Sequence, residues 1–228
     1  MEKHSKDYHD YVFRDGKLIG DFESMYKNSS IIPWRQDETA YSWYNDSFLT
    51  LLDEYAPFKN GIEIGCGIGF FTKRLQKFGN FCGVDVSTTA IKKAIELHQS
   101  IEFFEYDITS EMNDSRYQEK FDIVVLKDII WYIFEKIDRV MANIEKLFGS
   151  GKYLYIIQSF PRQDKEFIGK EVFSEPSDLV RYIVEKDFDI LRTIKIRIYE
   201  NKEDGEMVAI LAKRRKNSDI RTNSSKRR

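Results

Sequence analysis

The residues best placed to do chemistry in this chain are three glycines and an acid in the stretch GIEIGCGIGFF. Gly65, Gly67 and Gly69 occupy every second position, and Glu63 stands two residues ahead of the first of them. Glycine is used where a backbone must turn tightly or come close to a ligand. Because an apolar run leads into it, the motif predicts a ligand-binding turn that follows a strand.

Two nucleotide-binding motifs fit this turn poorly. The dinucleotide motif G-x-G-x-x-G/A needs a small residue at position 70, where this chain has Phe70. A phosphate-binding loop would end in Gly-Lys-Ser/Thr, and the stretch does not. The glycine turn alone is weak evidence for any one ligand. The pattern becomes more specific when Glu63 ahead of the turn and Asp85 at the end of the next apolar run are added to it.

Five apolar runs alternate with amphipathic stretches between residues 61 and 160. The runs are GIEIGC, FCGVDV, IEFFEYDI, FDIVVL and YLYIIQSF. Their length and their content of Val, Ile and Phe are typical of strands buried on both faces. The stretches FFTKRLQKF, TTAIKKAIELH and FEKIDRVMANIEKLF have helical spacing. Ser87 is predicted to cap the second helix and Gly149 to Gly151 to end the third.

The region after residue 160 predicts a helix over residues 178–186 and two further strands, FDILRTIKIRIYE and EMVAILAKR. The Asp-Gly pair between these strands favours an antiparallel hairpin. The predicted fold is therefore α/β: a doubly wound, Rossmann-like seven-stranded sheet of five parallel strands plus a C-terminal antiparallel hairpin. The predicted division is an aromatic N-terminal helical lid over residues 1–57, the main domain over 58–212, and a basic, disordered tail over 213–228.

Charge and composition restrict the class of protein. The formal net charge is −2, but the tail carries eight Lys/Arg and one Asp, a net +7, which leaves −9 for the residues before it. An acidic body is a poor match for a phosphate backbone, so no nucleic-acid partner is expected. Cys66 and Cys82 have no His or Cys at metal-ligand spacing and are expected to be buried, reduced thiols. Without a signal peptide or membrane-spanning run, the protein is expected to be cytoplasmic, with no membrane partner.

The order and spacing of Glu63, the three glycines, Asp85 and Asp107 resembles the class I S-adenosylmethionine-dependent methyltransferases, over about residues 40–212. The resemblance implies S-adenosylmethionine as the cofactor, S-adenosylhomocysteine as the product, and no metal. It implies that Glu63 leads the first motif and that Gly65, Gly67 and Gly69 line the pocket.

The same resemblance implies how the adenosine part is held. Asp85 would take both ribose hydroxyls, with Val86 beside it, since each carboxylate oxygen can accept a hydrogen bond. Asp107 would meet the adenine amino group, and the backbone at Ile108 would contact the ring. Each acid also has a simpler interpretation: Glu63 as a helix cap, Asp85 as the start of a turn, and Asp107 as a solvated strand end.

The acceptor is expected beyond the end of the fourth strand, in VVLKDIIWYI. This placement puts Lys127, Asp128, Trp131 and Tyr132 near the transferred methyl group, and Lys127 is assigned to the cofactor site. The alternative interpretation is that Trp131 belongs to the core and that Lys127 is solvated. The candidate catalytic residues are His9, Tyr132 and Asp128. No histidine follows the fourth strand, which slightly favours nitrogen as the acceptor atom, or an oxygen acceptor served by one of these three.

The N-terminal stretch IPWRQDETAYSWYNDSFLTLL resembles the Asp-Pro-Trp-led entry of small-molecule methyltransferases related to the nodulation N-methyltransferases, with Ile32 in place of the Asp. Trp34, assigned to the cofactor site, and Tyr41 would cover the cofactor and favour its sulfonium by cation–π attraction, or simply pack the lid. Arg35 and Lys127 could hold an anionic acceptor. The resemblance also implies acceptors such as sugars, nucleotide-linked intermediates or amines of surface-polysaccharide or secondary-metabolite pathways.

The sequence thus predicts methyl transfer to N or O of a small, polar, anionic metabolite by a monomer or homodimer. Motifs of adenine and cytosine methyltransferases are absent. One alternative is a protein or RNA methyltransferase that docks through the basic tail, and another is a non-catalytic adenosylmethionine-binding scaffold. A nicotinamide-dependent oxidoreductase is disfavoured by Phe70.

Overall fold

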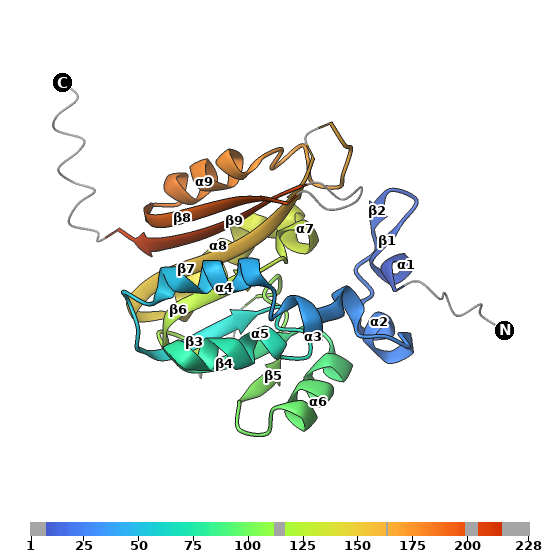
Figure 1. The fold of residues 1–228 in the computed structure, drawn as a ribbon, viewed down its shortest axis with the longest axis horizontal. Coiled ribbons are helices and arrows are strands. Elements are labelled where there is room, and N and C mark those ends of the chain that lie inside the picture. Colours follow the sequence, from blue (N-terminus) through green and yellow to red (C-terminus); the bar gives the residue numbers. More distant parts are fainter. Residues whose placement is uncertain (1–7, 112–116, 163, 199–204, 216–228) are drawn as a thin grey trace.

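A seven-stranded sheet runs through the centre of the molecule, with helices on both faces (Figure 1). The structure is a computed structural model that describes residues 8–111, 117–162, 164–198 and 205–215. The strands are β3 (Phe58–Ile64), β4 (Gly79–Asp85), β5 (Phe103–Glu105), β6 (Phe121–Lys127), β7 (Phe148–Pro161), β8 (Phe188–Ile198) and β9 (Gly205–Arg214).

The strand order is β5-β4-β3-β6-β7-β9-β8, and the pairs from β5 to β7 are parallel. Strand β9 is antiparallel to both β7 and β8. The predicted parallel sheet with a C-terminal antiparallel hairpin is therefore confirmed. The predicted hairpin turn falls mainly on residues 199–204, outside the described residues.

The two faces of the sheet bury separate apolar clusters, because successive side chains of a strand point to opposite faces. On β6, Val124 and Leu126 pack toward one cluster, and Ile123 and Val125 toward the other. The first cluster is covered by α8 (Ile137–Leu147) and α9 (Pro176–Glu185), and the second by α4 (Trp43–Leu49) and α5 (Phe70–Leu75).

Helix boundaries follow local chemistry. Ser87 caps α6 (Thr88–Leu97) by accepting a hydrogen bond from the Ala90 N–H, as predicted. The expectation that Gly149 and Gly151 end the preceding helix is wrong, because α8 ends at Leu147 and β7 begins directly at Phe148. Both glycines lie in β7 where it passes backbone atoms at the start of β6; an added Cβ would lie 2.8 Å and 2.6 Å from carbonyl oxygens there.

The N-terminal segment, residues 8–57, is a chain of short elements; the first of them lie beside one end of the sheet, and α4 lies over one face (Figure 1). These are α1 (His9–Val12), β1 (Phe13–Arg14), β2 (Lys17–Leu18), α2 (Phe22–Asn28), η1 (Pro33–Arg35), α3 (Gln36–Thr39), α4 and η2 (Thr50–Leu52). The hairpin of β1 and β2 was missed. Its turn residues Asp15 and Gly16 both have positive φ, as the Asp-Gly pair in RDGK could have indicated.

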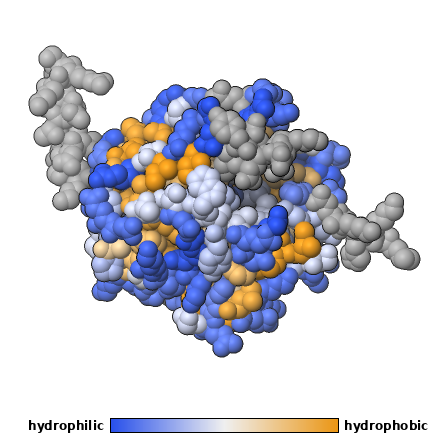
Figure 2. Space-filling view, in the orientation of Figure 1, coloured by the Kyte–Doolittle hydropathy of each residue, from blue (hydrophilic) through white to orange (hydrophobic). Residues whose placement is uncertain are grey.

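The first two residues of the predicted tail belong to the sheet. Lys213 and Arg214 continue β9, and the Arg214 guanidinium lies 2.6 Å from the Glu145 carboxylate. Residues 216–228 lie outside the described part of the chain. Hydrophilic side chains dominate the face seen in Figure 2. Within the described ranges, every helix is too short or too polar to span a bilayer.

Candidate functional site

A cavity of about 610 Å³ opens where the parallel strands end. Residues from the ends of four neighbouring strands line it: Asp85 from β4, Gly65 after β3, Lys127 from β6 and Ser159 from β7. This edge is where open α/β sheets bind their ligands, and the volume is typical of a small-molecule site. The N-terminal segment forms the opposite wall, with Phe22, Trp34 and Tyr44 among its contributions.

The glycine turn connects β3 to α5. Gly65, Gly67 and Gly69 have φ of 71°, 55° and 84°, values that favour glycine. Only Gly65 of the three lines the cavity. A Cβ on Gly67 would lie 2.4 Å from the Gln36 amide, and one on Gly69 would lie 2.6 Å from the Phe103 ring. A Cβ on Gly65 would lie 2.5 Å from the Ile129 side chain, so protein packing explains glycine at all three positions.

Asp85 lies beneath this turn and lines the cavity. Its two carboxylate oxygens accept hydrogen bonds from the backbone N–H of Gly67 (2.8 Å) and of Ser87 (2.9 Å). Burial raises the pKa of Asp85, while these hydrogen bonds oppose the rise. Val86, beside it, also lines the cavity and is 46% exposed. The carboxylate is thus fixed in position with acceptor capacity left on each oxygen.

Asp107 follows β5 at the other end of the cavity. Its carboxylate accepts hydrogen bonds from Thr109 N–H and Oγ1 and from the Ser110 hydroxyl. Burial alone would raise the pKa of Asp107, but these hydrogen bonds bring it below its ordinary value. Ile108 is buried and lines the cavity, and its carbonyl accepts a hydrogen bond from Asn143.

Glu63 is buried at the end of β3, where it lines the cavity floor. Its carboxyl group accepts a hydrogen bond of 2.5 Å from the Thr72 hydroxyl on α5. Burial raises the pKa of Glu63 to about 8, against the opposing effects of Thr72 and of the charge on Lys127. Near neutral pH the Glu63 carboxyl group of the free protein is therefore mostly protonated.

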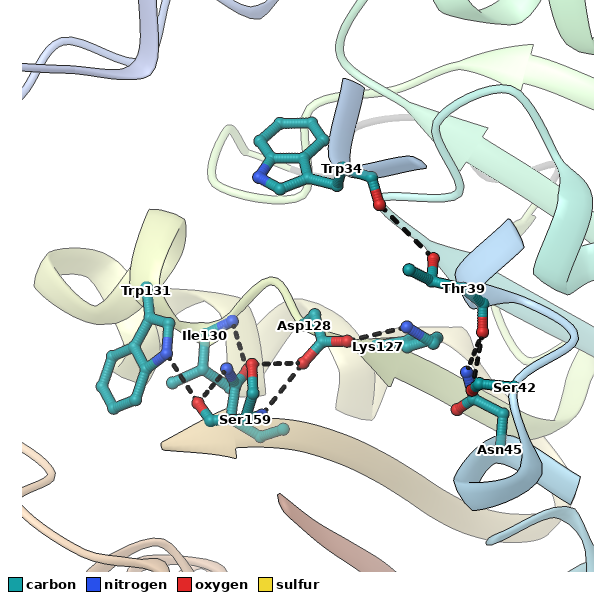
Figure 3. A network of polar contacts seen from close by, with 10 residues as sticks. Trp34, Thr39, Ser42, Asn45, Lys127, Asp128, Ile130, Trp131 and Ser159 are labelled. Carbon is teal, nitrogen blue, oxygen red and sulfur yellow. Dashed lines mark hydrogen bonds and ion pairs between the residues drawn. The ribbon is translucent and has the colours of Figure 1, made fainter. Parts of the chain in front are cut away.

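Lys127 and Asp128 form an ion pair of 2.7 Å at the end of β6 (Figure 3). Asp128 has a φ of 53°, and its Oδ1 accepts hydrogen bonds of 2.9 Å from both the N–H and the hydroxyl of Ser159 on β7. Burial alone would lower the pKa of Lys127, but the adjacent Asp128 carboxylate raises it, and the net effect is a raised pKa. Backbone strain of this kind, held by surrounding bonds, is common at functional sites.

The turn after β6 is tied down by contacts that the sequence did not reveal. Gln158 accepts a hydrogen bond from Ile130 N–H, and the Trp131 indole donates to the Ser159 carbonyl (2.9 Å; Figure 3). Trp131 does not line the cavity, although Asp128 and Ser159 do. The polar pair Gln158–Ser159 at the end of an apolar run was the available signal.

An aromatic wall covers the cavity from the N-terminal segment. The Tyr132 ring lies 5.8 Å from Trp34 and 5.2 Å from Phe22, between ring centres, and all three line the cavity. Burial raises the pKa of Tyr132, so its phenol stays protonated.

The N-terminal segment also bonds directly to the glycine turn and to α6. The Gln36 side chain accepts a hydrogen bond from Ile68 N–H and donates to the Tyr26 hydroxyl. The Glu23 carboxylate accepts hydrogen bonds from the Ser87 hydroxyl and from Thr89 N–H and Oγ1, at the start of α6. None of these contacts was predicted.

Four further residues considered from the sequence lie away from the cavity: His9, Arg35, Tyr41 and His98. His9 is exposed and stacks on Tyr8, with 4.1 Å between ring centres. Tyr41 is 55% exposed and lies against Arg74. Arg35 is exposed and paired with Glu38.

His98 ends α6, and its ring packs between Phe70 and Phe103. His4 lies outside the described residues. Within the described ranges, no three His, Cys, Asp or Glu side chains come together to hold a metal ion.

Residues 59–209 match the model of a methyltransferase domain family. A putative methyltransferase of Invertebrate iridescent virus 6 is 29% identical over 174 residues, 72% of this chain and 64% of the relative. Nodulation protein S of Sinorhizobium fredii is 26% identical over 103 residues, 44% of this chain and 47% of the relative. The matches thus span less than two thirds of these curated relatives.

Among solved structures, the chain is similar to the N-methyltransferase NodS from Bradyrhizobium japonicum WM9 in complex with S-adenosyl-L-homocysteine. The TM-score is 0.61 at 20% identity, over 80% of this chain and 92% of that protein. At this identity the similarity concerns the fold.

Proposed function

Because the chain belongs to the methyltransferase domain family, we propose that it binds S-adenosylmethionine in the cavity and methylates the nitrogen of a small-molecule amine. The observation that carries the acceptor class is the chemistry of the cavity lining. Besides the three acids that suit the cofactor, Asp128 and Glu135 line it, and no histidine does among the described residues. Aromatic rings and carboxylates favour cationic or amine ligands.

The residues of the cavity suit the cofactor. Asp85 has acceptor capacity on both carboxylate oxygens for the ribose hydroxyls, and Gly65 lines the cavity through its backbone. Asp107 would hold the adenine amino group, with Ile108 and Val86 against the ring. The three glycines of the turn would contribute by shaping it, since their Cβ positions face protein. Glu63 and Lys127 offer an anion and a cation for the amino-acid end.

When bound, the cofactor would supply an electrophilic methyl group whose leaving group is the thioether of S-adenosylhomocysteine, so a neutral amine nitrogen could accept the methyl group without covalent help from the protein. The task of this chain is then to align the acceptor and to remove water. Trp34 and Tyr132 would form the wall beside the acceptor, and Asp128 would accept a hydrogen bond from the amine N–H. Tyr132 stays protonated and would act as wall and donor.

An anionic acceptor has less support, because Arg35 lies outside the cavity and Lys127 would already meet the amino-acid end of the cofactor. His9 would have no part in catalysis, since it stacks on Tyr8 outside the cavity. The acidic body also favours a small molecule over a nucleic acid.

The test uses the full chain and S-adenosylmethionine labelled in its methyl group. Acceptors are offered as matched pairs that differ only in an amine or a hydroxyl on one carbon skeleton, such as a 2-amino-2-deoxy sugar and its parent sugar. We expect label to reach amines alone. Transfer to the hydroxyl members, or only to added RNA or protein, would overturn the proposal.

A further inference from the structure

The three rings of the aromatic wall, Phe22, Trp34 and Tyr132, meet at different angles. The plane of the Tyr132 ring makes an angle of 73° with that of Phe22 and of 46° with that of Trp34. All three side chains line the cavity. Rings tilted in this way face several directions, like the walls of a box. Ring faces attract a methylated ammonium as well as a bare one, because cation–π attraction needs no N–H donor.

The Asp128 carboxylate brings negative charge to this wall. It is close enough to Tyr132 to contribute to the raised pKa of the phenol. Among the described residues, Asp128 Oδ1 accepts two hydrogen bonds from Ser159, and Oδ2 accepts one from Lys127 (Figure 3). A carboxylate has about four lone-pair sites, so about one is left for a ligand.

This single remaining site bears on which amine fits. When a neutral amine directs its lone pair at a methyl donor, its N–H groups face the protein; a primary amine has two of them and a secondary amine has one. Asp128 can accept one N–H, and a second would face the rings, where a donor without an acceptor is unfavourable. A methyl group in that place would pack on the rings instead. The acceptor side of the cavity therefore suits a secondary amine at least as well as a primary one.

We infer that the aromatic wall binds methylated ammonium groups, so that this chain adds a second methyl group to its own monomethylated product. The inference rests on the proposed function. The first product would lose a proton to water, and the nitrogen lone pair would then form a second N–CH₃ bond while the S–CH₃ bond breaks and its electron pair stays on sulfur. A third transfer should be slow, because a dimethylated amine has no N–H left for Asp128.

The first arm of the experiment measures binding by calorimetric titration into the full chain saturated with S-adenosylhomocysteine. Ethanolamine, its N-methyl and N,N-dimethyl derivatives and choline carry the same charge near neutral pH and differ in their number of methyl groups. The neutral isostere of choline, 3,3-dimethylbutan-1-ol, is the fifth probe. We expect the affinity to rise with each methyl group, and choline to bind about tenfold more tightly than its isostere.

Variants of Trp34 test whether the ring causes that preference. Trp34→Leu keeps an apolar side chain but removes the ring, so the ratio of the two affinities should fall by about threefold or more, whereas Trp34→Phe should keep most of it. Trp43→Leu is the matched control, since Trp43 is 58% exposed and does not line the cavity, and it should leave the ratio unchanged. Loss of affinity for choline and its isostere by one common factor in Trp34→Leu would overturn the inference.

The second arm follows methyl transfer. The amine that takes the label in the test of the proposed function is offered in its unmethylated and N-methyl forms, and the products are identified by mass spectrometry. We expect the dimethylated amine from both, with the N-methyl form converted at least as fast. An N-methyl form that is not converted, or equal affinity of the wild-type chain for choline and its isostere, would overturn the inference. If the chain did not bind S-adenosylhomocysteine, or if no amine took the label, the proposed function itself would fail.

Discussion

The floor of the cavity and the N-terminal segment that covers it are held in different ways. On the floor, Asp85 and Asp128 are fixed by backbone N–H groups of Gly67, Ser87 and Ser159, at the ends of paired strands. The segment is held chiefly by side chains, such as Glu23 on the start of α6. Backbone anchors persist as long as the sheet does, whereas side-chain anchors can be released one by one. The floor should therefore determine affinity, and the segment should control access.

The largest expected effect is on the floor. Asp85→Ala removes the carboxylate proposed to hold the ribose and also releases Gly67 N–H. Hydrogen bonds to a charged group contribute about 1.5–3 kcal/mol each, so the affinity for S-adenosylhomocysteine should fall by at least about 100-fold. Titration calorimetry would measure it. Asp53→Ala, at an exposed acid, is the control, and an unchanged dissociation constant in Asp85→Ala would exclude the proposed ribose contact.

The second effect is a pH dependence that only the floor should show. Glu63 has a pKa of about 8 in the free protein, raised by burial despite Thr72 and Lys127 and with Asp85 adding to the rise. A ligand ammonium favours the ionised form of Glu63. Below the pKa of the free protein, binding therefore releases a proton from Glu63, and the affinity for S-adenosylhomocysteine rises with pH.

The slope should approach tenfold per pH unit between about pH 6 and 7.5, below the range in which the ligand's own α-amino group deprotonates. Glu63→Gln should bind with little dependence on pH. Titrations in two buffers of different ionisation enthalpy would count the released proton. The same slope in both proteins would assign the proton to another group.

The third effect belongs to the N-terminal segment. Hydrogen bonds from Thr89 and Ser87 lower the pKa of Glu23 to about 2. The group is therefore ionised throughout the neutral range, and its contribution is lost only as pH falls toward 2. Glu23→Ala should speed dissociation of S-adenosylhomocysteine by about tenfold, the equivalent of one or two exposed hydrogen bonds.

Stopped-flow fluorescence would follow that dissociation. The ratio of the dissociation rates of Glu23→Ala and the wild type should be the same at about pH 6 and pH 8, whereas the effect of Glu63→Gln on binding should change with pH. Glu38→Ala, which removes another exposed acid of the same segment, is the control. If both variants dissociated at the wild-type rate, the segment would not control access through Glu23.

The floor, held by backbone groups at strand ends, could be predicted from the sequence better than the N-terminal segment, which is held by side chains. Residues at strand ends, such as Asp85 and Lys127, could be predicted because apolar runs fix where each strand ends and parallel strands end at one edge. Glu23 lies 64 residues from Ser87, and Gln36 lies 32 residues from Ile68. Contacts between residues so far apart in the sequence produce no local sequence pattern, so they could not be predicted.

The glycine turn was predicted correctly in its place and only partly in its physical reason. The sequence attributed Gly67 to the ligand, whereas the structure puts the Gln36 amide where its Cβ would lie. The aromatic N-terminal stretch predicted Trp34 and Tyr41 at the cavity, but Tyr41 lies outside it, and so does His9, which was predicted as a catalytic residue. Short elements have no period long enough to tell inward from outward side chains.

The smallest effect is expected where floor and segment meet, at Tyr132. Burial raises the pKa of its phenol, so near neutral pH the group is protonated and cannot serve as a base. Tyr132→Phe keeps the ring against Trp34 and Phe22 and should change kcat by less than about threefold, with an unaltered pH profile. Tyr132→Ala removes the ring and should raise KM for the acceptor, since the wall is lost. A large loss of kcat in the Phe variant, with a changed pH profile, would instead make the phenol the proton acceptor and Tyr132 part of the catalytic machinery.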